Sequence, residues 1–446
     1  MMKYDNYKDS GIEWIGEIPE HWDISKLKFH CKIFNGDSLK DDEKIKYSAM
    51  IENSVPYVST KDIDLDASKI DYHNGLRIPI DNIKFKIAPK NSFLICIEGG
   101  SAGRKLAFVD EDIYFVNKLA CFNSNENNNS KYLFFYIQSP LFQKQFQISM
   151  SGLIGGVAIS LIRNFESLFP PIDEQLSIAN YLDHKTTQID TLIAKKQQFI
   201  SLLQEERTAL INQAVTKGLD PKVKMKDSGI EWLGEIPEHW EVKKLKFFCF
   251  ITKLSGFEYT KEWETNENGE IIALRGYNIS NGKVNDIKTE RISSELSLKL
   301  FRSKLYKNDI VYPCTGTIGN AAIIQENDKY HINQNIARIN PNTDLVYPEF
   351  LFYNLIADAT KKQIDFNNSS SMQPVILIGD LRNITIAFPP YEEQFELVVM
   401  IEKALKKIDT VFNNSLQEIE LLKEYKTALI SEVVTGKVDV RKEKLN

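Results

Sequence analysis

The sequence predicts a mixed α/β (α+β) protein with a pseudo-twofold internal repeat, in which two globules are separated by two long antiparallel helices that form a coiled coil. Three observations predict this fold class. One block of residues occurs twice, starting at Lys8 and again at Lys226. The unlike stretches after these blocks contain short β-type runs such as "FLICI" and "DIVYP". Two later stretches repeat apolar residues with the heptad spacing of long packed helices.

The repeat sets the order of the segments. Between Lys8–Cys31 and Lys226–Cys249, 24 positions align and 19 are identical, including "IPEHW" in both copies. A second block recurs as "FPPIDEQ" and "FPPYEEQ", so each half has a repeated opening, a variable part and a repeated end. The predicted segments are a first globule with its opening repeat at 1–168, a first spacer helix at 169–217, a linker at 218–226, a second globule with its opening repeat at 227–387, and a second spacer helix with a C-terminal tail at 388–446.

The variable parts, roughly 32–165 and 250–384, share only faint echoes. "VPYVSTKDI" parallels "IIALRGYNI", and "GGSAGRKLAFV" parallels "CTGTIGNAAII". Both parts consist of short β-rich runs broken by Gly, Asn and Pro, so each is expected to form a small α/β or mostly-β globule.

The closing blocks predict the helices. Two prolines and an acidic first turn suit a helix start, where amide donors lack partners and the helix dipole is positive. Apolar residues then hold the heptad positions, with polar residues at the seam in Lys196, Arg207, Ser415 and Lys426. Further apolar residues lie outside the seam and predict a partner-binding surface, namely Leu192, Phe199, Leu202, Val399, Val411 and Leu421.

No catalytic or metal site is predicted. In DNA amino-methyltransferases a D/N/S-P-P-aromatic loop holds the flipped base, but Phe169 and Phe388 stand here where the hydrogen-bond acceptor must be. The sequence contains no P-loop, and its six histidines have no metal-ligand spacing. His21 and His239 are expected to be hydrogen-bonded packing residues. Four tryptophans of the opening repeats are expected to anchor these repeats against the helices, at positions 14, 22, 232 and 240.

The composition sets the class of protein. Of 446 residues, 43% are hydrophobic and 26% are charged, which is typical of soluble proteins with two to four domains. No apolar run is long enough for a membrane span. The five scattered cysteines lack a C-x-x-C pair, which argues against disulfides and structural zinc and for a cytoplasmic location. A net charge of −6 argues against an indiscriminate nucleic-acid coat but permits a local basic groove.

Taken in order, these blocks resemble one family: the specificity subunits of type I restriction–modification systems. The resemblance rests on "IPEHWDISKLKF" and "IPEHWEVKKLKF", the two FPP helix starts, the helix ends "TALINQAVTKG" and "TALISEVVTGK", and the turns "GSAG" and "GTIG". It covers the whole chain. One departure is that the run "SSSMQ" before the second helix has no glutamine counterpart before the first, so no role for that residue carries over to the first half.

The resemblance implies a DNA-binding chain that is not itself catalytic. It implies two target-recognition domains, double-stranded DNA as ligand, and two docked modification subunits with adenine methyltransferase chemistry, to which restriction subunits can be added. No cofactor is expected in this chain; S-adenosylmethionine, ATP and Mg²⁺ belong to the partner subunits. Since the supports are alike and the globules unlike, the target should be bipartite and asymmetric.

Arg, Lys, Asn and Gln read base edges, while basic side chains and backbone donors hold phosphates. We therefore expect DNA contacts near the echoed segments and their glycine turns, with Arg104 and Arg275 as the strongest candidates. The candidates of the first globule are Ser59, Thr60, Lys61, Arg77, Lys84, Lys86, Arg104 and Lys105. Those of the second are Arg275, Asn278, Arg291, Arg302, Thr315, Thr317, Asn320, Asn333 and Gln334.

Two other functions stay open at this stage. The chain could be an adenine methyltransferase, or a fusion of one with a reader, although the acceptor and the cofactor loop are missing. It could also be a coiled-coil adaptor without nucleic acid. Binding of S-adenosylmethionine by the chain alone would favour the first, and pulldown of genomic fragments with no shared sequence would favour the second.

Overall fold

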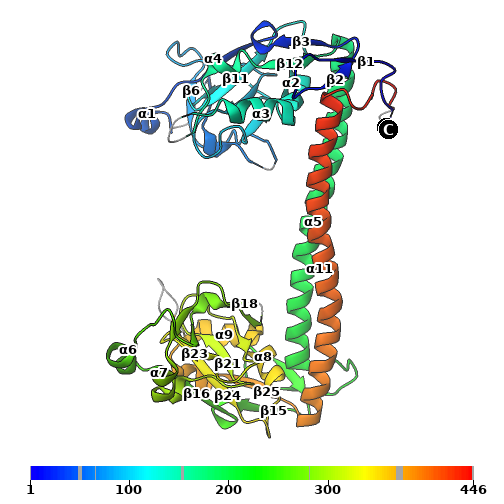
Figure 1. Ribbon diagram of the computed structural model, residues 1–446. Helices are drawn as coiled ribbons and strands as arrows, with labels where there is room; N and C mark the ends of the chain where they lie inside the picture. The colour runs from blue at the N-terminus through cyan, green and yellow to red at the C-terminus, as the bar shows by residue number, and fades with distance from the viewer. Residues whose placement is uncertain are drawn as a thin grey trace. The chain divides into compact units, whose positions relative to one another are not determined.

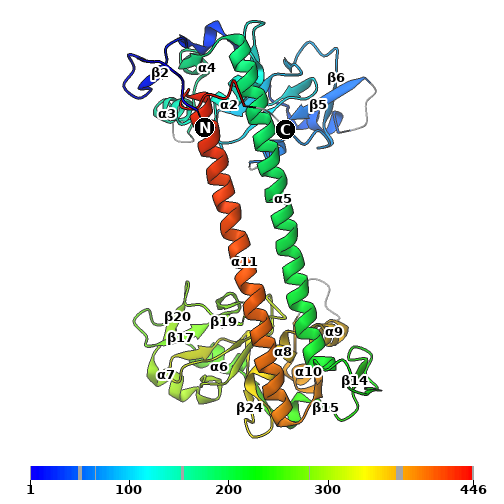
Figure 2. The ribbon, with the colours of Figure 1, turned by 90° about the vertical axis from the view of Figure 1, so that its right-hand side faces the viewer.

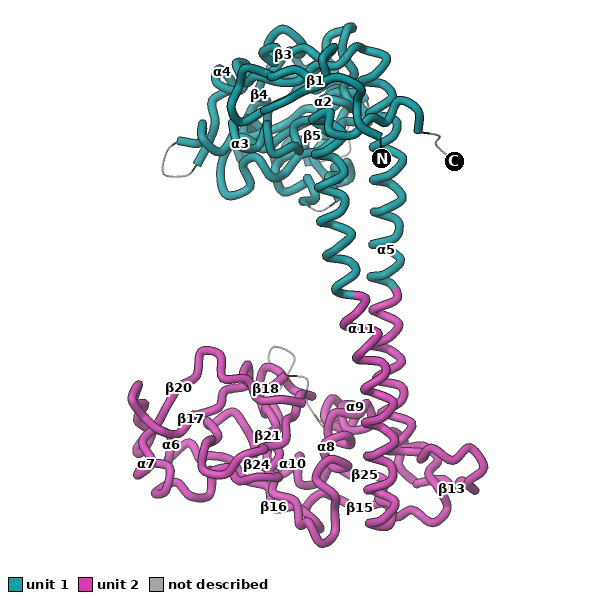
Figure 3. The backbone as a smooth tube through the Cα atoms, turned by 45° about the vertical axis from the view of Figure 1, so that its right-hand side comes forward, with its two compact units in different colours: residues 1–198, 416–446 teal, residues 199–415 magenta. Residues whose placement is uncertain are grey.

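The computed structural model describes residues 2–48, 53–65, 67–151, 155–280, 282–367 and 375–443. The chain forms two compact units, unit 1 with residues 1–198 and 416–446 and unit 2 with residues 199–415 (Figure 3). The long helices α5 (Ile172–Lys217) and α11 (Tyr391–Val434) each pass from one unit into the other. The predicted boundaries at 169 and 388 therefore lie three residues before the long helices begin. The compact units, in contrast, divide both helices near their middle.

Unit 1 contains two four-stranded sheets (Figure 1). One has the order β4-β11-β8-β9 and is antiparallel throughout, and the other has the order β6-β5-β10-β7 with β5 and β10 parallel. Its strands are β1 (Tyr7–Asp9), β2 (Glu17–Pro19), β3 (Asp23–Lys26), β4 (Cys31–Asn35), β5 (Ser54–Val58), β6 (Arg77–Pro79), β7 (Ile87–Ala88), β8 (Phe93–Cys96), β9 (Leu106–Phe108), β10 (Ile113–Phe115), β11 (Leu119–Ser124) and β12 (Glu166–Phe169).

Short helices cover these sheets. Asn129 and Ser139 cap two of them by accepting the backbone N–H of Tyr132 and Phe142, as small polar residues do at helix starts. The helical segments of unit 1 before α5 are η1 (Leu27–Phe29), α1 (Asp41–Lys46), η2 (Thr60–Asp62), α2 (Ser130–Tyr136), α3 (Pro140–Ile148) and α4 (Ile159–Ile162).

Unit 2 repeats the sheet topology although the variable sequences differ. The order β16-β24-β21-β22 matches the first sheet of unit 1, and the parallel pair β17–β23 matches β5–β10. Its strands are β13 (Met225–Asp227), β14 (Glu235–Pro237), β15 (Glu241–Lys244), β16 (Cys249–Lys253), β17 (Ile271–Leu274), β18 (Ile279–Ser280), β19 (Lys283–Val284), β20 (Glu290–Ile292), β21 (Ile310–Pro313), β22 (Ala322–Ile323), β23 (Tyr330–Ile332), β24 (Ile336–Pro341) and β25 (Thr385–Phe388).

The helices of unit 2 follow the same plan. Ser255 and Ser293 cap two of them through their hydroxyl oxygens. The helical segments are η3 (Leu245–Phe247), α6 (Gly256–Glu262), η4 (Gly276–Asn278), α7 (Ser294–Lys299), η5 (Phe301–Ser303), α8 (Pro348–Ile356), α9 (Asp358–Asn367) and α10 (Ile378–Asn383). The predicted mixed α/β class with an internal repeat is confirmed.

The heptad seam is confirmed along both long helices. On α11 the seam residues from Val398 to Val433 are buried or half-buried, and most residues between them are exposed. On α5 the same holds from Ala179 to Ala214. Ile189 of α5 and Leu429 of α11 share the core of unit 1, and Leu203 shares a core with Ile408 in unit 2.

Ion pairs show that the two helices are antiparallel. In unit 1, Lys426 donates to both carboxylate oxygens of Asp190 at 2.7 and 2.8 Å, and Lys196 pairs with Glu418. As the residue number rises along α5, the number of the paired residue on α11 falls, so the two helices run in opposite directions. Figure 2 shows the helices side by side. In unit 2, Arg207 approaches Asp409 at 3.5 Å. The three basic seam residues therefore meet carboxylates across the pair, as register-setting residues do, whereas Ser415 donates to the Val411 carbonyl of its own helix at 2.8 Å.

The opening repeat docks onto the first turn of a long helix in each unit. In unit 1, Glu174 accepts hydrogen bonds from Tyr4 (2.6 Å) and Trp22 (3.1 Å) and lies 2.7 Å from His21 Nε2. In unit 2, Glu393 pairs in the same way with the equivalent histidine and tryptophan. The hydrogen bonds predicted for both histidines are confirmed, but their side chains are 39% and 48% exposed, so they are not packed in the core.

The tryptophans divide into two classes. Trp22 and Trp240 are completely buried, as expected of anchors. Trp14 is 43% exposed, so its predicted anchoring role is wrong. Among the described residues no aromatic ring packs on Trp14 as Phe366 of α9 packs on Trp232, at a ring-centroid distance of 5.3 Å. Equivalent residues of the sequence repeat thus have different neighbours in the two units.

The FPP blocks are structural. Phe169 ends β12 and stacks on His30 with ring centroids 3.4 Å apart, and Phe388 ends β25 and packs on Phe248 at 4.7 Å. The glutamine of each block accepts the backbone N–H of the residue before a helix of its globule. The predicted helix starts are confirmed, since α5 and α11 begin directly after the prolines.

Candidate nucleic-acid interface

The echoed segments form equivalent turns in the two units. "VPYVSTKDI" builds β5 and η2 in unit 1, and "IIALRGYNI" builds β17 and η4 in unit 2. "GGSAGRKLAFV" and "CTGTIGNAAII" form the glycine turns between β8 and β9 and between β21 and β22. Gly103 and Gly319 have φ values of +75° and +91°, a conformation that side chains disfavour.

In unit 1 the two turns meet. The Lys105 ammonium donates to the carbonyl oxygen of Thr60 at 2.8 Å, which joins the glycine turn to η2. Ser59 caps η2: its backbone N–H and hydroxyl both donate to Asp62, at 2.8 and 2.6 Å. Arg104 is exposed and donates to the carbonyl of Gly100 within its own turn. The structure thus gathers the candidates Ser59, Thr60, Lys61, Arg104 and Lys105 around one pair of turns.

The other candidates of unit 1 are held elsewhere. Arg77 on β6 donates to the carbonyl of Ser54 at 2.6 Å and stabilises the β5–β6 pair. Lys84 pairs with Glu43, and Lys86 with Asp37 at 3.7 Å, between β6 and β7. Lys84 and Lys86 are therefore already ion-paired within the protein, and Arg77 is hydrogen-bonded to an uncharged residue.

The equivalent turns of unit 2 also meet. Thr317 donates its hydroxyl to Gly276 at 3.2 Å, and Asn320 donates its amide to Ile279 at 3.4 Å. Thr315 forms a β-bridge with Val375, so a third segment flanks this glycine turn. The run "SSSMQ" that precedes Val375 lies outside the described residues.

Two candidates of unit 2 are corrected. Asn278 is completely buried, accepts the backbone N–H of Arg275 at 3.0 Å and donates to Ile287 at 2.9 Å, so it shapes the turn. Asn333 is only 4% exposed between β23 and β24. Neither side chain reaches the surface of this unit, because the turn geometry draws both inward.

The remaining candidates of unit 2 differ in availability. Arg302 is exposed on η5, and Gln334 is half-buried beside Asn333. Arg291 on β20 donates to the carbonyl of Gly269 at 3.1 Å. Arg275 forms an ion pair with Glu290, and this hydrogen bond raises the pKa of the guanidinium above its usual range.

The sequence reasoning missed two residues at this turn. Tyr277 is 51% exposed within η4 and donates its hydroxyl to Lys288 at 2.8 Å. It lies inside the quoted echo "RGYN", where an aromatic residue in a polar turn was the available signal. Glu290 had no such signal, since it reaches Arg275 only through the pairing of β20 with β17.

A family model decides the assignment of the chain. The model described as the type I restriction modification DNA specificity domain matches twice, at residues 19–201 and 237–421. The chain belongs to the type I restriction–modification DNA specificity family. Each match begins at the proline of one IPEHW sequence and includes one globule and most of the following long helix. The sequence repeat and the family repeat therefore coincide.

Full-length relatives of this specificity family are known. The chain is 27% identical over 98% of its length to the MjaVIII specificity subunit of Methanocaldococcus jannaschii, of which it covers 97%. It is 24% identical over 91% of its length to the EcoKI specificity subunit of Escherichia coli, of which it covers 88%.

Solved structures agree with the specificity-subunit fold. The HsdS subunit of Thermoanaerobacter tengcongensis has a TM-score of 0.54 at 14% identity, with 94% of this chain and 98% of that chain covered. A chain from a structure of type I R-M complex assembly has a TM-score of 0.70 at 15% identity, with 94% and 99% covered.

The long helices of this specificity chain carry exposed apolar residues. All six predicted partner-binding side chains are between 41% and 54% exposed. Others share this property, including Ile172 and Leu176 at the start of α5 and Tyr391 and Phe395 at the equivalent start of α11. The sequence reasoning missed this second set, which is repeated on both helices. Its two residues on each helix are one helical turn apart.

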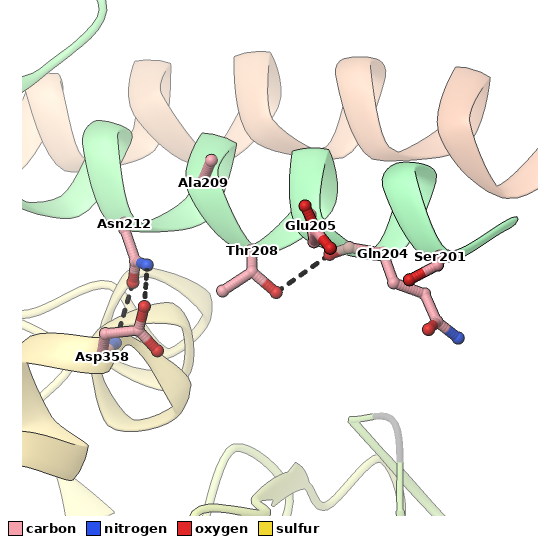
Figure 4. A pocket seen from close by; sticks show the side chains of 7 residues that line it. All are labelled: Ser201, Gln204, Glu205, Thr208, Ala209, Asn212 and Asp358. Atoms are coloured by element: carbon pink, nitrogen blue, oxygen red, sulfur yellow. Dashed lines mark hydrogen bonds between the residues drawn. The ribbon is translucent and has the colours of Figure 1, made fainter. Parts of the chain in front are cut away.

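One groove lies along α5 in unit 2 (Figure 4). It is lined by Ser201, Gln204, Glu205, Thr208, Ala209, Asn212 and Asp358. Asn212 and Asp358 bond to one another, with the Asn212 amide donating to the Asp358 carboxylate at 2.5 Å and its carbonyl accepting the Asp358 backbone N–H at 2.8 Å. These two hydrogen bonds hold the start of α9 against α5 at one end of the groove.

Neither a metal cluster nor a membrane-spanning helix is present in the described part of the chain. Within it, no three His, Cys, Asp or Glu residues are grouped so as to hold a metal ion. Across the same ranges, no helix is both long and apolar enough to span a membrane.

Proposed function

We propose that this chain is the noncatalytic DNA-reading subunit of a type I restriction–modification complex and reads a bipartite, asymmetric target. Each globule would read one half-site through the paired turns around its glycine turn. The cytoplasm would be its working compartment.

One observation carries the proposal: the supports are the same in both units and the turns are not. His21 and Trp22 dock on Glu174 as His239 and Trp240 dock on Glu393. At the equivalent turns, however, Ser59 stands where unit 2 has Arg275. Alike supports suit alike partners, whereas unlike polar turns suit unlike base sequences.

The alike supports point to two copies of one partner, the modification subunit that supplies adenine methylation. Leu192 and Leu202 on α5 and Leu421 on α11 are exposed apolar side chains on otherwise polar helix faces. Such residues mark interfaces when several gather on one element. S-adenosylmethionine, ATP and Mg²⁺ would be bound by the partner subunits.

The methyltransferase alternative is disfavoured by the FPP blocks. A target adenine needs an acceptor side chain facing an open pocket. Phe169 and Phe388 are instead buried at the ends of β12 and β25, against His30 and Phe248.

The test is an exchange of globules. Residues 32–165 are replaced by the equivalent part of another specificity chain, and the complex with its modification subunits is expressed in a host without other adenine methylation. Sequencing that detects methylated adenine should show one half-site changed and the other retained. If the unaltered complex methylates no specific sequence, the proposed function is wrong. If the exchange changes both half-sites, the globules do not read them separately.

A further inference from the structure

We propose that Glu290 is a positioning residue that fixes Arg275 as a reader of a base edge in the half-site of unit 2. This inference rests on the proposed function and adds to it a mechanism of specificity. It uses only residues of unit 2.

Arg275 stands at the point where β17 becomes η4. Its backbone is extended, with φ −112° and ψ 163°, so its side chain continues the alternation of the strand. Ala273, two residues earlier on the same face, is directly opposite Glu290 on β20. Glu290 is therefore a diagonal cross-strand neighbour of Arg275, a separation that long side chains can bridge.

The ion pair engages only part of the guanidinium. Arg275 Nη2 donates to Glu290 Oε1, while the Nε of Arg275 and the Oε2 of Glu290 are buried and have no hydrogen-bond partner among the described residues. The Arg275 side chain still has 41% of its surface exposed. One side of the planar fork is thus held by the protein while the side chain remains accessible to a ligand.

The backbone beneath this pair is also fixed. The buried amide of Asn278 accepts the N–H of Arg275 and donates to the carbonyls of Asn285 (3.2 Å) and Ile287 (2.9 Å). The hydroxyl of Tyr277 adds a bond to Lys288. These bonds tie η4 to the segment that leads into β20, so both members of the ion pair stand on one braced loop.

Such bracing favours discrimination over affinity. A guanidinium held in one orientation presents two donors to the acceptors of guanine, a geometry that a mobile side chain must first adopt. The carboxylate of Glu290 also repels phosphates, which lowers attraction to DNA of any sequence. Unit 1 lacks this device, because Ser59 takes the place of Arg275 and bonds to Asp62.

The experiment compares Glu290→Gln with the unaltered chain, both in complex with modification subunits. Methylation rates are measured on a DNA library with every single base change in both half-sites, and binding to unrelated DNA is measured at two salt concentrations. For Glu290→Gln we expect discrimination at one base pair of one half-site to fall by about tenfold. Binding to unrelated DNA should tighten by a few fold, and the other half-site should be read as before.

A matched control separates orientation from charge. Glu262→Gln removes a carboxylate from another ion pair of the same unit, Lys299–Glu262, and should leave discrimination unchanged. Arg275→Lys keeps the charge but removes the fork, and should lose discrimination at the same base pair as Glu290→Gln. This variant is decisive where Glu290→Gln fails to fold.

The inference is overturned if Glu290→Gln folds and reads every position as the unaltered chain does, or if Arg275→Lys changes no position. In both cases specific methylation by the unaltered complex would leave the proposed function standing. An unaltered complex that methylates without sequence preference would overturn both.

Discussion

Glu174 accepts the indole N–H of Trp22 at 3.1 Å, and 219 residues later Glu393 accepts that of Trp240 at 3.0 Å. In each pair the tryptophan belongs to the opening repeat and the glutamate to the first turn of a long helix. Carboxylates near helix N-termini are stabilised by the helix dipole. The duplicated sequence therefore encodes one joint, built twice, between a globule and the helix that follows it.

The two joints should differ in strength. Glu174 is 5% exposed and has three side-chain partners, whereas the side chain of Glu393 is 30% exposed and has two. Glu174→Ala leaves buried donors on Tyr4 and Trp22 unpaired, so we expect a loss of about 3 kcal/mol in the free energy of unfolding. Glu393→Ala should lose about 1–2 kcal/mol.

Urea titrations followed by tryptophan fluorescence would measure both losses. Asp173→Ala is the matched control, since Asp173 is an exposed neighbour in the same helical turn and its loss should cost less than about 1 kcal/mol. Equal losses for Glu174→Ala and Glu393→Ala would contradict the greater burial of the first joint.

The Asp190–Lys426 pair should contribute a measurable but salt-sensitive coupling. Their side chains are 47% and 21% exposed, so the coupling in a double-mutant cycle should be about 0.3–1 kcal/mol at low salt. At 1 M salt the screening length shortens to about 3 Å and the coupling should fall by half or more. The equivalent pair, Arg207 with Asp409 at 3.5 Å, makes one long contact and should couple more weakly. A coupling that is independent of salt would contradict this account.

The sequence predicted those features whose determinants are local or periodic. The heptads fixed which residues of α5 and α11 would be buried, because a 3.5-residue period defines one helix face. The double proline and acidic turn fixed both helix starts. The echoed segments predicted equivalent turns even though the residues between them differ.

Features that depend on contacts between distant segments were not predictable. The Arg275–Glu290 pair requires the register of β17 against β20, which the alternation of residues did not specify. Asn278 and Asn333 are polar turn residues that the fold draws inward, and polarity alone suggested exposure. Trp14 and Trp232 occupy equivalent repeat positions but only Trp232 has a ring from α9 against it.

The cysteines should be unreactive in the folded chain. All five are free, and burial raises the pKa of Cys31 and Cys121 to about 12 and that of Cys314 to about 11. Because the thiolate is the nucleophile, iodoacetamide at pH 8 should label less than one thiol per native chain within minutes and all five in denaturant. Mass spectrometry reads both numbers. Rapid labelling of Cys121 in the native chain would contradict its burial.

The helix surface should determine assembly with the modification subunits. Leu202 on α5 and Leu421 on α11 are 53% and 54% exposed, so aspartate at either position places a charge on a face that is already solvated in the free chain. Its cost to the folded chain should be only the helix propensity difference, about 0.7 kcal/mol or less per site. In a complex the same carboxylates would be buried against apolar partner residues without a counter-charge, which costs several kcal/mol.

We therefore expect Leu202→Asp combined with Leu421→Asp to fold and to abolish the complex in size-exclusion chromatography with the modification subunit. Leu298→Asp is the control, since Leu298 is 61% exposed on α7, outside the long helices, and should leave assembly intact. Circular dichroism must show unchanged helix content in both variants. If the double variant still elutes as the full complex, these leucines are not at the interface, and the repeated apolar pairs at the helix starts, Ile172–Leu176 and Tyr391–Phe395, become the surfaces to alter next.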